Sequence, residues 1–225
     1  MRRNQTPYVC AYAAARVAML ALCCDGWNAP ALAAQTEQVN TRPGLSITVD
    51  LIDSAEVAPG TRSRAEHEFE HIMQTAGISV AWIEGDANTP VDLLADAIVL
   101  RILPKAGPSD DPKALGVALA PGPGGIYATI FFDRVCERVA DPVLSKAGAR
   151  LEGVLGHAMA HEIGHLLLGM NSHSASGLMS AVWRVEDFRR LARGQFNFRP
   201  DEAARMRSEV ARRNAQRRGA LAKAH

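Results

Sequence analysis

The sequence predicts an α+β fold, in which a twisted, mixed sheet of about five strands is backed by a helix and followed by a small, mostly helical C-terminal part. Three observations support this prediction. Five short segments rich in β-branched and apolar residues occur between residues 45 and 132. One amphipathic helical pattern falls between the first two segments. From about residue 146 onward the patterns are helical or irregular.

The first strand is expected at 45–52, where polar and apolar residues alternate. A helix follows over 62–76 and ends at Gly77, a residue common just past helix ends. The second strand is expected at 78–83.

The third strand, 97–103, is almost entirely apolar, which predicts a central strand buried on both faces. A fourth strand at 115–120 is expected at an edge of the sheet. The glycine- and proline-rich segment 121–125 turns the chain into a fifth strand at 126–132.

The composition is that of one globular domain with an ordinary hydrophobic core. Of 225 residues, 48% are hydrophobic and 22% are charged, and the formal net charge is +1. This charge provides no overall field for nucleic acid, and the basic run at 212–219 is interpreted as a solvated helix end. We therefore expect no nucleic-acid partner.

Residues 1–33 have the pattern of a signal peptide. Arg2 and Arg3 form a basic start, 17–24 is a short apolar segment, and 31–33 supplies a small-residue cleavage site. The apolar segment is too short to cross a bilayer, so no membrane span is expected. The remaining chain, 34–225, is predicted to be a single domain that is exported to the periplasm or secreted.

Three of the four cysteines lie in this N-terminal segment, and Cys136 is the fourth. The mature domain is therefore expected to have no internal disulfide. Hydrophobic burial, with or without a metal ion, must then stabilise it.

The pattern His-Glu-x-x-His occurs twice, at 67–71 and at 161–165. On a helix, histidines four residues apart differ by about 40° in direction and about 6 Å in height, so both can reach one metal ion. In the first copy, His67 and His71 point away from the apolar stripe of their helix, and Glu68 has no apolar wall around it. We therefore interpret the first copy as a solvated helix face.

The second copy lies within 151–169, a segment that is apolar on nearly all sides and therefore predicts a helix through the core. Buried there, His161, Glu162 and His165 would each need a polar partner. One metal ion satisfies all three, which favours a metal site over a hydrogen-bonded pair.

Residues downstream extend this site. Gly169 is expected to end the helix and reverse the chain, and His173 follows eight residues after His165. Three histidine nitrogens would leave a fourth coordination position open, as in catalytic zinc sites. A turn at 177–180 then places Met179 where it could lie beneath the metal.

These residues resemble the metzincin clan of zinc peptidases and its small exported bacterial members, whose pattern is His-Glu-x-x-His-x-x-Gly-x-x-His with a later methionine turn. The resemblance covers most of 45–183, and only 161–179 is specific to the motif. It implies that His161, His165 and His173 bind zinc and that Glu162 is the general base. It also implies that Met179 is the residue of the Met-turn, and that an upper subdomain of about 45–169 is followed by a lower one of about 170–217 and a basic tail at 218–225.

The chain departs from the family pattern in three places. The glycine comes four residues after His165 instead of three, the third histidine comes eight residues after it instead of six, and Trp183 stands where some members have a tyrosine. Glu186 or Asp187 is the alternative third ligand, in the manner of other zinc hydrolases. His157, one turn before His161, is too far from His165 on a straight helix to share its ion, so it is expected beside the site.

The expected activity is zinc-dependent endopeptidase hydrolysis, in which Glu162 accepts a proton from a zinc-bound water. The expected partner is a peptide or protein substrate that lies extended along 115–120. Two alternatives are a metzincin-shaped zinc-binding protein with little turnover and a hydrolase of a non-peptide amide. The sequence gives no indication of the oligomeric state.

Overall fold

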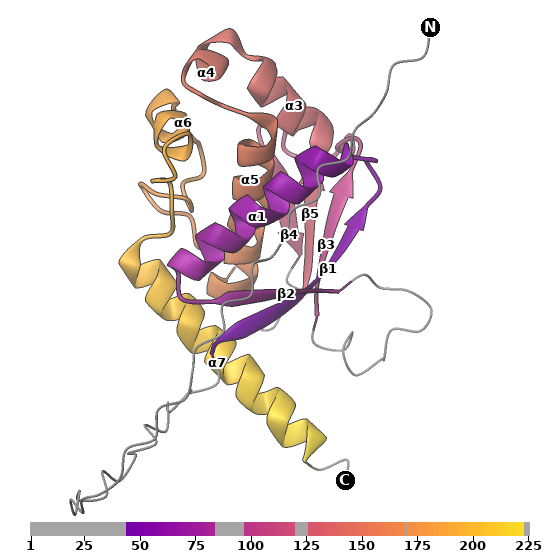
Figure 1. Cartoon of the computed structure of the whole chain (residues 1–225), viewed down its shortest axis with the longest axis vertical. Helices are drawn as coiled ribbons and strands as arrows, with labels where there is room; N and C mark the ends of the chain where they lie inside the picture. Colours follow the sequence, from indigo (N-terminus) through magenta and orange to yellow (C-terminus); the bar gives the residue numbers. More distant parts are fainter. Residues whose placement is uncertain (1–43, 84–96, 120–125, 170, 223–225) are drawn as a thin grey trace, which may run out of the picture. The chain divides into compact units, whose positions relative to one another are not determined.

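The computed structural model describes residues 44–83, 97–119, 126–169 and 171–222. The predicted signal peptide and the turn at 121–125 lie outside these ranges. The described residues form a mixed five-stranded sheet and six helices (Figure 1). The strands are β1 (Ser46–Asp53), β2 (Ser79–Ile83), β3 (Ile98–Leu103), β4 (Gly116–Leu119) and β5 (Tyr127–Phe131). The helices are α1 (Pro59–Thr75), α3 (Phe132–Ala140), α4 (Pro142–Lys146), α5 (Leu151–Leu168), α6 (Val185–Leu191) and α7 (Pro200–Leu221).

The strand order is β2-β1-β3-β5-β4. The first four of these run parallel to their neighbours, and β4 pairs antiparallel with β5. Each predicted strand is therefore confirmed to within about a residue at its ends, and β4 is confirmed as an edge strand. Its free edge is available because β5 is its only partner among the described strands.

Helices α1 and α5 cover one face of the sheet (Figure 1). The central side chains on that face are fully buried, namely Val49, Leu100 and Ile130. Helix α1 contributes Phe69 and Met73 to the same core. This layering holds α5 between the sheet and the C-terminal segments.

The prediction that 97–103 is buried on both faces is wrong. Strand β3 is central, yet Arg101 is exposed and its neighbours on that face, Val99 and Leu103, are only partly buried. The apolar run arises because the alternate positions that face away from the helices are still partly covered by the adjacent strands. A run of apolar letters does not separate one covered face from two.

The C-terminal elements extend the predicted plan. Helices α3 and α4 follow β5 directly, within a stretch for which no separate helices were predicted. Helix α1 begins at Pro59, three residues before its predicted start, because proline fits the first helical turn. Within the described ranges, no helix combines the length and the apolar character needed to cross a membrane.

Candidate metal centre

Helix α5 carries two of the candidate ligands through the core. Every residue from Val154 to Leu167 is buried, in agreement with the predicted core helix. The helix ends before Gly169, whose φ of 102° is strained for any residue with a Cβ. The chain can therefore reverse there and bring the following loop back toward the helix.

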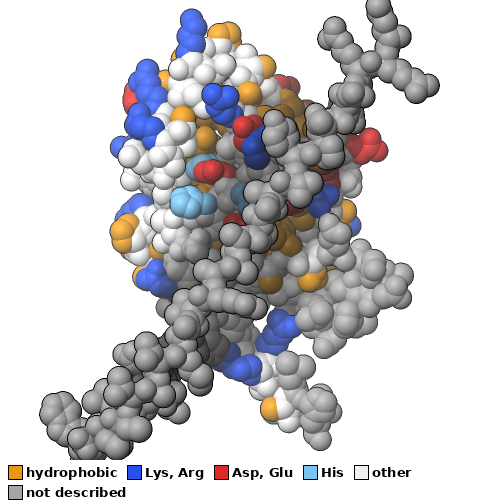
Figure 2. Space-filling view, in the orientation of Figure 1, with side chains coloured by type: hydrophobic (Ala, Val, Ile, Leu, Met, Phe, Trp, Pro, Cys, Tyr) orange, Lys and Arg blue, Asp and Glu red, His pale blue; other side chains and the backbone are white. Residues whose placement is uncertain are grey.

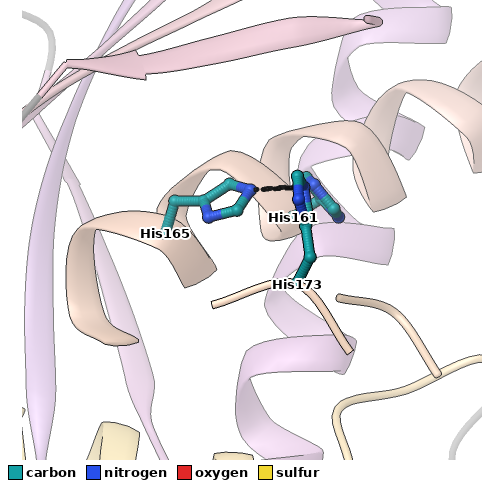
Figure 3. Close-up of side chains that lie close together, drawn as sticks. All are labelled: His161, His165 and His173. Atoms are coloured by element: carbon teal, nitrogen blue, oxygen red, sulfur yellow. Dashed lines mark hydrogen bonds between the residues drawn. The ribbon is translucent and has the colours of Figure 1, made fainter. Parts of the chain in front are cut away.

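That return brings three imidazoles together (Figure 3). His165 Nε2 lies 3.1 Å from His161 Nε2 and 3.2 Å from His173 Nε2. All three ligand atoms lie within 4.8 Å of one another. Zinc–nitrogen bonds of about 2.0–2.1 Å place tetrahedral ligands roughly 3.3 Å apart, so the 3.1 and 3.2 Å separations suit ligands of one ion. The three histidines are close enough to hold a metal, and no other such group occurs in the described residues.

The proton positions also favour a cation between the rings. His161 Nδ1 lies 2.8 Å from the carbonyl oxygen of Leu178, which can only accept, so Nδ1 donates. The Nε2 of a neutral His161 then carries an unprotonated lone pair, and it lies 3.1 Å from His165 Nε2. His165 can donate to only one neighbour, whereas a metal ion engages all three lone pairs at once.

Burial keeps the two helix histidines in the form that a metal requires. It lowers the pKa of His161 to about 4, and burial together with the neighbouring histidines lowers the pKa of His165 to about 4. Both are therefore neutral near pH 7, as ligand histidines must be. Their orientation is fixed from outside, since His165 Nδ1 lies 3.0 Å from Ser172 Oγ.

Glu162 lies beside the histidines with only 6% of its surface exposed. Burial raises the pKa of Glu162 to about 8, because the ionised form is poorly solvated there. The edge strand lies directly against it: a Cβ added to Gly116 would come within 2.8 Å of Glu162 Cγ and 2.5 Å of the Thr129 carbonyl oxygen. A residue with a side chain cannot occupy Gly116 without displacing the strand or the carboxylate.

Met179 packs against helix α5 at Gly164. It is fully buried, and a Cβ on Gly164 would come within 2.5 Å of its sulfur and 2.9 Å of Phe198 Cε1. Gly164 is one of the two unspecified positions of the second His-Glu-x-x-His motif. A glycine at this position lets Met179 lie under the helix between the two ligand histidines.

His157 is not part of the group of three. It is 1% exposed, and its Nδ1 donates to the Gly153 carbonyl oxygen at 2.8 Å. Burial lowers the pKa of His157 to about 4. Its ring lies edge-on to Trp183, which in turn lies edge-on to His161. His157 therefore lies beside the site through Trp183, as expected.

The acidic alternatives for the third ligand lie elsewhere. Glu186 is exposed and pairs with Arg189 on its own helix. Asp187 accepts a hydrogen bond from the backbone nitrogen of Arg184 and so caps that helix. Neither belongs to the group of three histidines, so His173 is the third member of the cluster despite the longer turn.

The first His-Glu-x-x-His copy is solvent-facing at its histidines, as predicted. His67 is 76% exposed and His71 is exposed, and Figure 2 shows histidine side chains on the surface over α1. The prediction for Glu68 is wrong. Its carboxylate lies 3.7 Å from His157 Nδ1, and burial raises the pKa of Glu68. Glu68 sits where α1 crosses α5, a contact between helices that the helix pattern alone did not reveal.

A cavity of about 380 Å³ opens beside the three histidines and Glu162. Helix α5 supplies one wall, β4 a second, and the segment after Met179 a third. Sequence reasoning missed several positions that shape the site: Gly116 lines the cavity, Gly164 lies against Met179, and Ser172 lies at His165. Only the glycine inside the motif carried a signal, since a helix interior normally disfavours glycine.

Comparison with known proteins does not assign this chain to a family. A scan against models of known protein families finds no match, and a search of curated proteins finds no similar sequence. The firm findings are therefore a mixed α/β fold and three adjacent histidines that could bind a metal ion.

Proposed function

We propose that this protein is a zinc-dependent endopeptidase similar to the metzincins. One observation carries the proposal: three histidine nitrogens converge next to a buried glutamate, at the wall of an open cavity. Three nitrogen ligands and an open position are typical of catalytic zinc sites, whereas structural sites have four protein ligands. His161, His165 and His173 would hold the ion, and Met179 would support it from below the helix.

Zinc bound there supplies Lewis acidity, which makes water a nucleophile near neutral pH and polarises a carbonyl group. In its ionised form, which a cation held by the three histidines would favour, Glu162 accepts the proton of the attacking water and passes it to the leaving amine. Its burial and its contact with Gly116 hold the carboxylate at the cavity wall. Leu178 and Ser172 keep the ligand rings oriented through the far nitrogens of His161 and His165.

The substrate would lie extended along the free edge of β4. That edge borders the same cavity as Glu162 and the three histidines. Backbone hydrogen bonds from an edge strand can hold any peptide in one direction and one register. An extended peptide placed there would have its backbone beside Glu162, because Gly116 touches that residue.

Two other functions start from the same site: zinc binding with little turnover, and hydrolysis of a non-peptide amide. The buried Glu162 favours an enzyme, because a purely structural ion does not need a buried glutamate beside it. The open strand edge next to the cavity favours an extended peptide over a small amide. Export of the mature chain is part of this proposal and agrees with a peptidase that meets its substrates outside the cytoplasm.

Metal analysis combined with a fluorogenic peptide-library digest tests the proposal. We expect one zinc per chain, cleavage of internal peptide bonds, and loss of cleavage on chelation with recovery when zinc is restored. One zinc per chain without cleavage of any library member would contradict the peptidase and favour the binding protein. Cleavage of simple amides without cleavage of peptides would favour the third function.

Replacement of Ser172 by Ala tests how the ligands are held. We expect zinc affinity to fall about 10- to 100-fold, because His165 loses the partner that fixes its ring. Competition with a chromogenic chelator measures this change. Ser176→Ala, at an exposed position in the same loop, is the control and is expected to keep the wild-type affinity. Equal affinities in the two variants would exclude this role for Ser172.

A further inference from the structure

The cavity beside the three histidines has a basic region that the proposed reaction does not use. Its lining includes Arg138 from α3 and Lys113 from the loop before β4. Helix α3 packs against α5, and both α3 and α4 lie toward the N-terminal end of α5 (Figure 1). On α5, Ala158 also lines the cavity. It lies one turn before Glu162, about 6 Å from it along the helix axis toward the N-terminal end. The cavity therefore extends from the histidines past Ala158 toward Arg138.

Arg138 is available to a ligand. Its guanidinium donates to the Lys113 carbonyl oxygen at 3.4 Å, and it forms no ion pair with a carboxylate of the described residues. Its side chain is partly buried, so water solvates it less completely than a free surface arginine. A guanidinium keeps several donors free after one contact with a carbonyl.

The other charges around the cavity do not cancel this one. Asp111 is the one carboxylate that lines the cavity near Arg138, and its Oδ1 already accepts from the Lys113 backbone nitrogen at 2.8 Å. Glu162 lies at the other end, beside the histidines. Lys113 and Arg138 carry two positive charges and Asp111 carries one negative charge, so the α3 end of the cavity is net positive.

Most of the remaining lining is apolar. The apolar walls are formed by Leu115, Val117, Val182, Trp183 and Phe188. A methylene chain fits such walls, and a guanidinium at the end of them selects a planar anion. Among amino acid side chains this combination describes glutamate best, followed by the shorter aspartate.

We propose that Arg138 is a specificity-determining residue that binds a carboxylate of the substrate, namely the side chain of an acidic residue next to the cleaved bond. The inference rests on the proposed function in that it places a peptide in this cavity. A free C-terminal carboxylate has the same chemistry, so the test must separate the two sources.

Binding of matched peptides to the zinc-loaded full chain tests the proposal. The probes are short fluorescein-labelled peptides of alanine and leucine with one central Glu or Gln, each made as a free acid and as a C-terminal amide. Glu162→Gln is the background, so that the probes stay intact during anisotropy titration. We expect the Glu peptide to bind about tenfold more tightly than the Gln peptide, because charged hydrogen bonds of this kind differ by about that factor. The difference should persist in the amide series, whereas a dependence on the free acid alone would assign the site to a C-terminus.

Arg138→Gln should bring the two affinities together, and Arg138→Lys should restore part of the difference. Arg134→Gln is the matched control: one turn earlier on α3, Arg134 also donates to the loop before β4, at the Ala114 carbonyl oxygen, but it does not line the cavity. This variant should keep the Glu preference. Equal binding of Glu and Gln peptides by the parent, or a preference that survives Arg138→Gln, would overturn the proposal.

Cleavage of the same peptides by the chain with Glu162 intact gives a second, independent result. An Arg138-dependent Glu preference in binding without any cleavage would sink the proposed peptidase and leave the carboxylate site standing. Cleavage without a Glu preference would support the peptidase and contradict the carboxylate site at Arg138.

Discussion

Replacement of Glu162 by Gln is expected to lower kcat/KM about 10²- to 10⁴-fold while the protein keeps one zinc per chain. Gln has nearly the same shape, so the contact with Gly116 and the cavity wall should be preserved. The amide cannot accept a proton from water, which removes the general base. Zinc should remain because its three ligands are the histidines. Steady-state peptide hydrolysis together with metal analysis of the same sample measures both quantities.

Glu152→Gln is a suitable control, since Glu152 lies in the first turn of the same helix, near Arg64 and away from the histidines. It should retain wild-type activity. The metal-free form of Glu162→Gln should be no less stable than the parent near pH 7, because a Glu162 with a pKa of about 8 is mostly protonated there and the amide replaces one neutral buried group with another. Hydrolysis within threefold of wild type by Glu162→Gln would rule out Glu162 as the base.

The sequence predicted those parts of the fold that depend on local patterns. The five strands are alternating or apolar segments between glycine- and proline-rich turns, and α5 is apolar on every side. The sequence pattern therefore located the strands and this helix. The distinction between the two His-Glu-x-x-His copies was also local, since the neighbours of His67 are charged and those of His161 are apolar. The convergence of His173 with the helix histidines depended on a single glycine that ends a helix.

What could not be predicted depends on contacts between distant segments. Glu68 was expected in water, but the crossing of α1 over α5 brings it to His157. Arg101 lies in an apolar run, and its exposure follows from the packing of the helices on the other face of the sheet, which the run does not reveal. Arg138 borders the cavity because α3 packs on α5, and nothing in its own neighbourhood in the sequence indicates that position.

Replacement of Gly164 by Ala is expected to destabilise the protein and to weaken zinc binding together. The new Cβ would come within 2.5 Å of Met179 Sδ, and both Met179 and Phe198 are buried, so neither side chain has free space to move into. Overpacking of this kind costs about 1–3 kcal/mol, and the gain in helix propensity from Gly to Ala offsets about 1 kcal/mol of it. Thermal unfolding with and without zinc, and chelator competition, measure the two effects.

Zinc affinity should fall because Met179 is tied to the loop that supports two ligands. The Met179 carbonyl oxygen accepts from the Ser174 backbone nitrogen at 2.9 Å, next to His173, and the preceding carbonyl, of Leu178, orients His161. A shift of Met179 therefore moves both supports. Gly153→Ala on the same helix is the matched control, because it gains the same propensity and its Cβ meets one terminal methyl group, Leu191 Cδ2 at 2.9 Å, instead of two side chains at 2.5 and 2.9 Å.

The double variant Gly164→Ala, Met179→Ala separates this steric account from a general intolerance of the helix. Truncation of Met179 removes the atoms that clash, so the Cβ of the new alanine then fills part of the vacated space. The two substitutions should be less destabilising together than the sum of the single changes, with a coupling of about 0.5–3 kcal/mol. Strict additivity, or equal stability and zinc affinity in Gly164→Ala and Gly153→Ala, would show that the packing of Met179 under the helix does not position the ligands.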